Sequence, residues 1–246
     1  MSMMSQLKKH ILNIIYPENI CCISCDKDLG INETYRYGLC NACEAQITWI
    51  TGRTCRACGG PLPIEHDSEI CYNCEKVESV LIRCEACYGY SGLGKDLIMD
   101  LKYKRKTHLG KYLARMMADV VKTTLIDDVD LIVSVPLHKK RLNERGFNQM
   151  DVIGEALSVD LSMPYENSAI TRTKNTPKMK TLDRQDRKHA INALFDANPD
   201  LVLGKRILLI DDIYTTGSTM NACAKSLLSA GALTVHGAVL SVNFRD

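Results

Sequence analysis

The stretch that decides the fold runs from Arg206 to Thr219 and reads RILLIDDIYTTGST. An apolar run of strand length comes first, and two adjacent acids follow it. A turn rich in hydroxyl side chains then leads into a second segment, which stops at Gly231. This order predicts a strand, a loop and a helix. In an open α/β sheet such a loop lies at the carboxyl end of its strand, where ligands bind.

The turn has the composition of an anion-binding site. Backbone N–H groups at the start of the helix and several hydroxyls would face one point, and Gly217 would let the backbone approach a phosphate closely. It is not a Walker loop, because no Gly-Lys-Ser/Thr is present. A turn of this composition can also end a strand and cap a helix without binding anything. The candidate ligand-binding residues of the turn are Asp211, Asp212, Thr215, Thr216, Gly217, Ser218 and Thr219.

Apolar patterning places this turn in an alternating succession of elements. Strands are predicted at residues 84–90, 130–135, 207–210 and 234–240, and helices near 93–101, 109–124, 148–158 and 219–230. Strands that alternate with helices form a mostly parallel sheet covered by helices on both faces. The fold class is therefore predicted to be α/β.

The cysteines indicate a second, smaller module at the N-terminal end. Eleven of the twelve cysteines lie before residue 90, and eight of them form a tandem repeat of Cys-x2-Cys pairs with a period near 31 residues. Two such pairs complete a tetrahedral four-sulfur site that suits structural Zn²⁺. Disulfides or a redox-active Cys-x2-Cys are the alternatives. The predicted ligands of two zinc sites are Cys22, Cys25, Cys40, Cys43, Cys55, Cys58, Cys71 and Cys74.

The segment around these pairs holds too few large apolar side chains to fold by burial alone, so metal binding would supply the missing free energy. We predict a domain over residues 1–80, with an amphipathic helix at 4–16 and a double zinc ribbon, and a second domain over 81–246. Cys84 and Cys87 are expected to be buried strand residues, with a redox role or a third metal site as the alternative. Cys223 is expected in the core.

The net charge is only +2, but basic residues cluster in three runs of the second domain. Each run alone is typical of a solvated face, whereas three together indicate a polyanion such as polyphosphate or nucleic acid. The candidate nucleic-acid contacts are Lys104, Lys139, Lys140, Arg141, Arg145 and Arg172. No apolar run reaches the roughly 18 residues that span a bilayer. We expect a cytoplasmic protein, because in a reducing compartment paired cysteines are more often metal ligands than disulfides.

Two more segments complete a recognisable set of motifs. Residues 130–136 predict a buried strand ending in Pro136 and Leu137 follows it, while residues 145–149 read RGFNQ. The acid pair and its turn resemble the phosphoribosyl pyrophosphate (PRPP) signature of type I phosphoribosyltransferases. The whole combination, with the paired cysteines, resembles the ComF family of late competence proteins over nearly the full chain.

This resemblance implies a type I phosphoribosyltransferase-like domain behind a double zinc ribbon. Asp211 and Asp212 would hold ribose hydroxyls and residues 215–219 the 5′-phosphate, while Pro136 and Leu137 would occupy the place of the pyrophosphate loop. It also implies a part in DNA uptake during natural transformation, with single-stranded DNA as ligand, a helicase of the same operon as partner and a place at the inner face of the membrane. The alternative is an active phosphoribosyltransferase that joins PRPP, bound with Mg²⁺, to an unidentified nitrogen acceptor.

The sequence departs from the family's usual pattern between Arg172 and Phe195. Arg172, Thr176 and Arg187 fit that pattern, but Met179 and Ala190 stand where Gln and Asn are usual. In catalytic relatives this segment closes over PRPP. An exposed basic loop without that role is the alternative.

Overall fold

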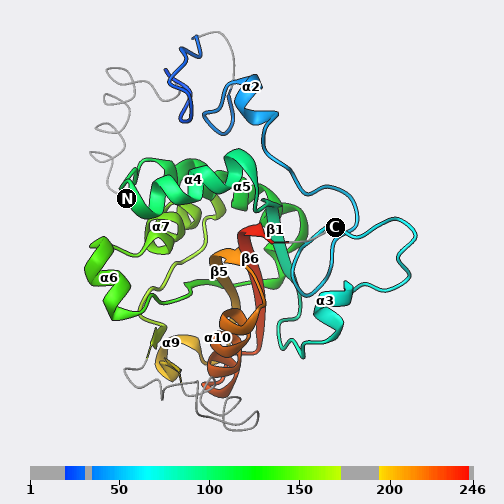
Figure 1. Ribbon diagram of the computed structural model, residues 1–246. Helices are drawn as coiled ribbons and strands as arrows, with labels where there is room; N and C mark the ends of the chain where they lie inside the picture. Colours follow the sequence, from blue (N-terminus) through cyan, green and yellow to red (C-terminus); the bar gives the residue numbers. More distant parts are fainter. Residues whose placement is uncertain (1–19, 31–34, 173–193, 244–246) are drawn as a thin grey trace.

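The computed structural model describes residues 20–30, 35–172 and 194–243, and its centre is a four-stranded parallel sheet (Figure 1). The strand order is β1-β6-β5-β2. The strands are β1 (Cys84–Gly89), β2 (Leu131–Ser134), β5 (Arg206–Tyr214) and β6 (Thr234–Val242). The predicted α/β class with a parallel sheet is confirmed.

The register of the sheet brings the carboxyl ends of its strands to one edge. β5 pairs with β6 from Arg206 opposite Thr234 to Tyr214 opposite Val242, and with β2 up to Ser134 opposite Ile210. All residues of β1 and β2 are buried, as expected for strands that are covered on both faces. The segments after β2 and β5 therefore emerge side by side.

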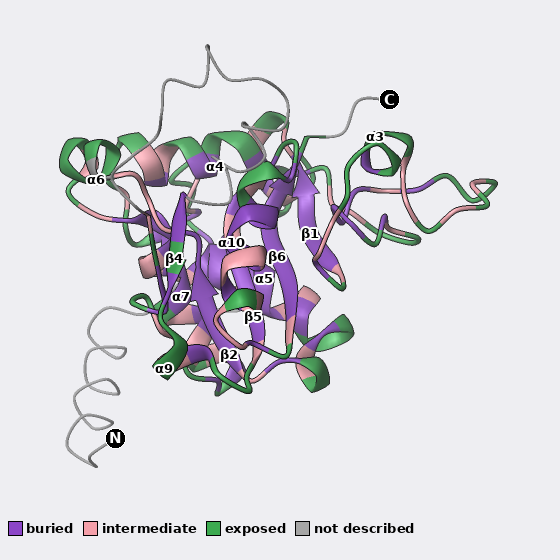
Figure 2. Ribbon diagram, turned by 90° about the horizontal axis from the view of Figure 1, so that it is seen from below, coloured by how far each residue is buried: buried purple, intermediate pink, exposed green. Residues whose placement is uncertain are grey.

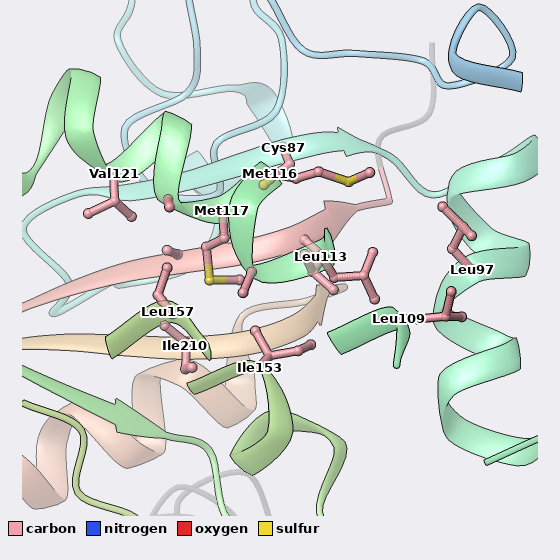
Figure 3. Packing of buried hydrophobic residues seen from close by; sticks show 14 of the residues in the cluster. Cys87, Leu97, Leu109, Leu113, Met116, Met117, Val121, Ile153, Leu157 and Ile210 are labelled. Carbon is pink, nitrogen blue, oxygen red and sulfur yellow. The ribbon is translucent and has the colours of Figure 1, made fainter. Parts of the chain in front are cut away.

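Helices cover both faces because alternate strand residues point to opposite sides. Leu208 and Ile210 pack into one cluster with α4, α5 and α7, and Figure 3 shows part of this cluster. Ile207 and Leu209 pack into a second cluster with α10, which crosses the other face (Figure 2). These helices are α4 (Gly92–Tyr103), α5 (Leu109–Thr124), α7 (Gln149–Leu161) and α10 (Ser218–Ser229).

Shorter elements join these layers. A two-stranded antiparallel sheet lies beside α10, and short helices lie between the longer elements. They are α2 (Asn41–Glu44), α3 (Tyr72–Glu75), η1 (Ile126–Asp128), α6 (Lys139–Arg145), β3 (Ile170–Arg172), β4 (Phe195–Ala197) and α9 (Pro199–Val202).

The two cysteine repeats pack against opposite faces of the same sheet. The first repeat, with α2, shares the cluster of α4, α5 and α7, and its Tyr37 hydroxyl donates to Asp119 of α5 at 2.6 Å. The second repeat, with α3, shares the cluster of α10. Its Arg56 carbonyl accepts from the Cys84 N–H of β1 at 2.8 Å. Each repeat is thus anchored on the sheet domain. The boundary near residue 80 stays a prediction.

Two details differ from the sequence expectations. β5 continues past the predicted end at residue 210 to Tyr214, because β6 is long enough to pair with it throughout. α6 and the paired strands β3 and β4 were not predicted, since these elements are short and lack a repeating apolar pattern. The predicted helix at 4–16 lies outside the described residues. Among the described helices, none has the length and apolar character needed to cross a bilayer.

Candidate functional site

Each cysteine repeat gathers four sulfurs at one point. Within each set of four, the Sγ atoms all lie within 4.8 Å of one another, and the two sets are those predicted from the spacing. The distance between Sγ atoms is 3.8 Å for Cys25 and Cys40, and 4.0 Å for Cys58 and Cys71. A tetrahedron with Zn–S bonds of about 2.3 Å has sulfurs about 3.8 Å apart, so both clusters have the size of a Zn(Cys)4 site.

The local backbone of the two sites repeats as well. The N–H of Cys40 points at the Sγ of Cys22 at 3.4 Å, and the N–H of Cys71 points at the Sγ of Cys55 at 3.3 Å. Burial opposes ionisation of Cys22, but backbone N–H groups, that of Cys40 first, lower the pKa of this thiol to about 7. Such N–H groups favour the thiolate that metal binding requires. The eight cysteines therefore fit two closed structural zinc sites.

The other buried cysteines lie in the sheet domain. Cys84 and Cys87 are buried on β1, and Cys223 is buried in α10. Among the described residues, neither cluster of metal-ligating side chains includes them. Burial raises the pKa of Cys87 and Cys84, which disfavours the reactive thiolate. Their expected structural role agrees with this environment.

The acid pair lies within β5 near its carboxyl end. Asp212 is 7% exposed, and its N–H donates to Oδ1 of Asp211 at 2.8 Å. Burial and then the charge of Asp212 raise the pKa of Asp211 to about 8, against the opposing effects of the Asp212 N–H and of Lys102. At neutral pH the Asp211 carboxyl is therefore mainly protonated.

Two side chains from other elements hold the Asp212 carboxylate. Lys102, at the end of α4, places Nζ 2.7 Å from Oδ1, and Gln149 of α7 donates from Nε2 to Oδ2 at 2.6 Å. Arg145 in turn donates to Oε1 of Gln149 at 2.8 Å. The acid pair is thus joined to α4, α6 and α7 by a continuous polar network.

The hydroxyl-rich turn between β5 and α10 is open to solvent. Thr215, Thr216, Ser218 and Thr219 are exposed, and the N-terminus of α10 has no side-chain cap. Gly217 adopts φ +71°, and a Cβ there would lie 2.1 Å from the Tyr214 hydroxyl, so glycine is required on both counts. The N–H of Ser218 donates to Oγ1 of Thr216 at 3.5 Å, and such a helix start is a favourable place for an anion.

Three residues of the motif RGFNQ have distinct structural roles. Gly146 ends α6 in a left-handed conformation with φ +80°, and Asn148 caps α7 by accepting from the Met150 N–H at 3.1 Å. Gln149 then reaches Asp212. Asn148 also donates to Asp151, which accepts from Tyr165 at 2.6 Å and from Ser134, the last residue of β2, at 3.1 Å. Pro136 and Leu137 follow Ser134 after one intervening residue and are partly buried.

A basic hollow of about 240 Å³ adjoins the acid pair. Arg145 lies over the Tyr103 ring, with Cζ 4.9 Å from the ring centroid, and it also donates to the Tyr103 hydroxyl at 3.2 Å. Tyr103 is 62% exposed, so the ring remains accessible to a ligand. The hollow is lined by Lys102, Tyr103, Arg105, Arg141, Glu144 and Arg145. Phosphate and an unstacked base are the groups that such a surface accommodates.

The predicted basic residues are divided between several positions. Arg141 and Arg145 line the hollow, whereas Lys104 is exposed and pairs with Asp100 at 2.7 Å. Arg172 packs over the Phe195 ring at 5.4 Å, and burial lowers its pKa. Lys140 is exposed on α6. Lys139 begins that helix, and Met179 and Ala190 lie outside the described residues.

Sequence reasoning did not single out Lys102, Gln149 or Asp151 as site residues. Lys102 stood within a basic run and Gln149 within RGFNQ, so a signal existed for both. No sequence signal marked Asp151, because its role depends on hydrogen bonds from Tyr165 and Ser134, which belong to other segments of the chain.

Family models match both the cysteine-rich part and the sheet part of the chain. The double zinc ribbon family model matches residues 11–75, and the phosphoribosyl transferase domain model matches residues 151–243. The adenine phosphoribosyltransferase of Thermoanaerobacter pseudethanolicus superposes with a TM-score of 0.37 at 16% identity, over 57% of this chain and 83% of that chain.

Several relatives match most of the chain. The DNA utilization protein YhgH of Escherichia coli O6:H1 is 32% identical, over 87% of this chain and 93% of the relative. Competence protein F of Haemophilus influenzae is 30% identical over the same shares. Competence protein ComFC of Bacillus subtilis is 26% identical, over 86% of this chain and 90% of the relative. The chain therefore belongs to the ComF family, in which a double zinc ribbon is joined to a phosphoribosyl transferase domain.

Proposed function

We propose that this protein handles single-stranded DNA during natural transformation, with the basic hollow as the contact surface and the β5–α10 turn as an adjoining phosphate site. The names of its relatives, competence protein F and DNA utilization protein, support a competence-related role. The observation that carries the proposal is the link from Arg145 through Gln149 to Asp212. It joins a cationic, aromatic hollow to a hydroxyl-rich turn at the start of α10.

The chemistry of the hollow suits a strand without a fixed sequence. Arg141 and Arg145 supply charge for phosphates, and the exposed Tyr103 supplies a ring on which a base can stack. Because phosphate contacts are electrostatic, the affinity for DNA falls as the salt concentration rises. Stacking on an aromatic ring is possible for every base, so it imposes no fixed sequence. The protein would accept a strand delivered by a helicase and hold it in this hollow.

A second candidate function is phosphoribosyl transfer, and the acid pair favours it. Asp211 and Asp212 would orient the ribose hydroxyls of Mg·PRPP, and the N–H groups of the turn would hold its 5′-phosphate. A nitrogen nucleophile would form a bond to the anomeric carbon as the bond to pyrophosphate breaks. Pyrophosphate would leave with the electron pair, and the nitrogen would release its proton to solvent. The chain's contribution would be positioning and charge stabilisation.

Titration of both ligands separates these functions. Fluorescence anisotropy with a labelled oligonucleotide would be measured at several salt concentrations, and calorimetry would follow Mg·PRPP. The Asp211→Asn/Asp212→Asn double variant would be titrated with both ligands for comparison with the native protein. DNA binding with a steep salt dependence supports the first proposal. PRPP binding that the variant loses, without any binding of DNA, would overturn it in favour of the enzyme.

A further inference from the structure

The loop that precedes α3 in the second cysteine repeat presents large apolar side chains to solvent. Ile64 is 90% exposed, and Tyr72, the first residue of α3, is 72% exposed. The loop extends away from the sheet beside α3 in both views (Figures 1 and 2). Burial would stabilise either side chain, so their exposure on one projecting segment indicates a surface that a partner covers.

Hydrogen bonds hold this loop in one conformation. Nη1 of Arg53 donates to the carbonyls of Ile64 and His66, at 3.0 and 2.9 Å. Nε2 of His66 lies 2.9 Å from the Ile70 carbonyl, and the His66 ring packs edge-on against Tyr72 with the ring centroids 5.2 Å apart. Because the loop is already ordered, binding a partner does not carry the entropic cost of ordering it. The two exposed side chains are therefore preorganised for a contact.

The surface around these side chains is acidic. Residues 61–75, which we call the ribbon knob, contain four acidic residues and neither lysine nor arginine. The four are all exposed and are Glu65, Asp67, Glu69 and Glu75. Of these, Glu69 pairs with Arg56 of the same repeat at 3.5 Å. Four thiolates around one divalent ion add negative charge nearby. The ribbon knob therefore repels a polyanion and is complementary to a basic surface with an apolar centre.

The same chain carries a surface of that kind on α6. This helix reads KKRLNER, with four basic residues and one acid. Leu142 lies in its middle and is 40% exposed. Arg141 directly precedes it and is exposed, and Arg145 lies about one turn further along the helix. The basic rim and apolar centre of α6 thus match the ribbon knob in both charge and hydrophobicity.

The two surfaces face away from each other within one molecule. Figures 1 and 2 both place α3 and α6 on opposite sides of the sheet. The second repeat is fixed in this position just beyond α3, where Asn221 of α10 accepts from the Val80 N–H at 2.9 Å and donates to the Glu78 carbonyl at 3.0 Å. A contact between the ribbon knob and α6 therefore joins two copies of the chain. Because each copy has both surfaces, the contact is head-to-tail and builds rings or open chains.

We propose that this protein associates with itself head to tail, with the ribbon knob of one copy seated on α6 of the next. Ile64 and Tyr72 would pack around Leu142, and the carboxylates of the knob would face Arg141 and Arg145. Both arginines also line the basic hollow, so the contact would cover part of the surface that the proposed function assigns to DNA. Self-association itself does not depend on that function, because it needs no ligand.

Sedimentation velocity of the zinc-loaded full chain tests this contact. The native protein is measured from about 5 to 500 µM, and we expect reversible association with a Kd of about 10–100 µM, as for small transient interfaces. Raising NaCl from about 0.05 to 0.5 M should weaken the association at least about fivefold, because salt screens the facing charges.

Substitutions on each surface locate the contact. Ile64→Ser alters the ribbon knob and Arg141→Glu alters α6, and each should weaken association at least about tenfold. Val159 is 63% exposed on α7 and belongs to neither surface, so Val159→Ser is the matched control. We expect this control to change association less than about twofold.

Mixing the two defective variants tests whether the contact is head-to-tail. The Ile64→Ser protein keeps a native α6, and the Arg141→Glu protein keeps a native ribbon knob, so one native contact can form between them. We expect a heterodimer at concentrations where each variant alone is monomeric. Recovery of association in the mixture also shows that both variants are folded.

Native protein that stays monomeric up to about 500 µM would overturn the inference and leave the ribbon knob to a partner of another sequence. Variants that associate like the native protein, or a mixture that stays monomeric, would overturn it as well. If either variant loses its zinc or its circular-dichroism spectrum, Glu65→Gln/Asp67→Asn replaces Ile64→Ser and Leu142→Ser replaces Arg141→Glu under the same criteria. A DNA titration of dilute native protein reports on the proposed function separately. Absence of DNA binding would refute that function and leave the self-association standing.

Discussion

Lys102 Nζ lies 2.7 Å from Oδ1 of Asp212, and both side chains are about nine-tenths buried. The acid pair that would hold ribose hydroxyls is thus partnered by a lysine that also lines the basic hollow. A ligand with a diol and an adjacent phosphate can engage both members, because the phosphate offers Lys102 a new anionic partner as the diol engages Asp212. This ion pair connects the acid pair to the basic hollow.

Replacing Lys102 with Met should destabilise the protein, because the buried carboxylate of Asp212 loses its cationic partner. Removing one partner of a buried ion pair lowers the free energy of unfolding by about 3 kcal/mol. For a domain of this size, that loss lowers Tm by about 6–12 °C. Adding Asp212→Asn removes the uncompensated charge and should restore most of the loss. Scanning calorimetry of native, single and double variants measures this. A double variant less stable than Lys102→Met would contradict the argument.

The raised pKa of Asp211 predicts that stability declines with rising pH. Below its usual pKa near 3.8 the carboxyl is protonated in both folded and unfolded chains. Between there and about pH 8 the folded chain binds the proton that the unfolded chain has released, so this group's contribution falls by up to about 1.4 kcal/mol per pH unit. Denaturant unfolding from pH 5 to 8 should show this slope in the native protein, and Asp211→Asn should remove it. Parallel curves for the two proteins would refute it.

Much of the site could be predicted because its residues are adjacent in sequence. The zinc ligands follow from spacing alone, and the turn follows from one strand, two acids and a hydroxyl run. The partners of the acids could not be predicted, because Lys102 and Gln149 reach Asp212 from helices more than sixty residues upstream. Likewise, the packing of the two ribbons on opposite faces depends on tertiary burial, which local spacing does not encode.

The two ribbons should differ in their effect on the turn. Cys40→Ser and Cys71→Ser each remove one ligand, so zinc measured by mass spectrometry should fall from two ions per chain to about one. Among the described residues, it is the second ribbon that adjoins the β5–α10 turn and is followed by the contacts to Asn221. We therefore expect Cys71→Ser to weaken Mg·PRPP binding about tenfold or more and Cys40→Ser to leave it nearly unchanged. Equal losses would instead indicate a general folding defect.

The exposed ring of Tyr103 and the charge of Arg141 should contribute to DNA binding in separable ways. Tyr103→Ala removes a stacking surface, which costs about 1–3 kcal/mol of binding free energy per base without changing the salt dependence. Arg141→Ala removes one phosphate contact and should reduce the slope of log affinity against log salt by about 0.7. Lys205→Ala, an exposed substitution at the opposite end of β5, is the matched control. Anisotropy titrations at several salt concentrations measure all three. An unchanged slope for Arg141→Ala, or a slope reduced equally by Lys205→Ala, would mean that the strand does not lie in the basic hollow.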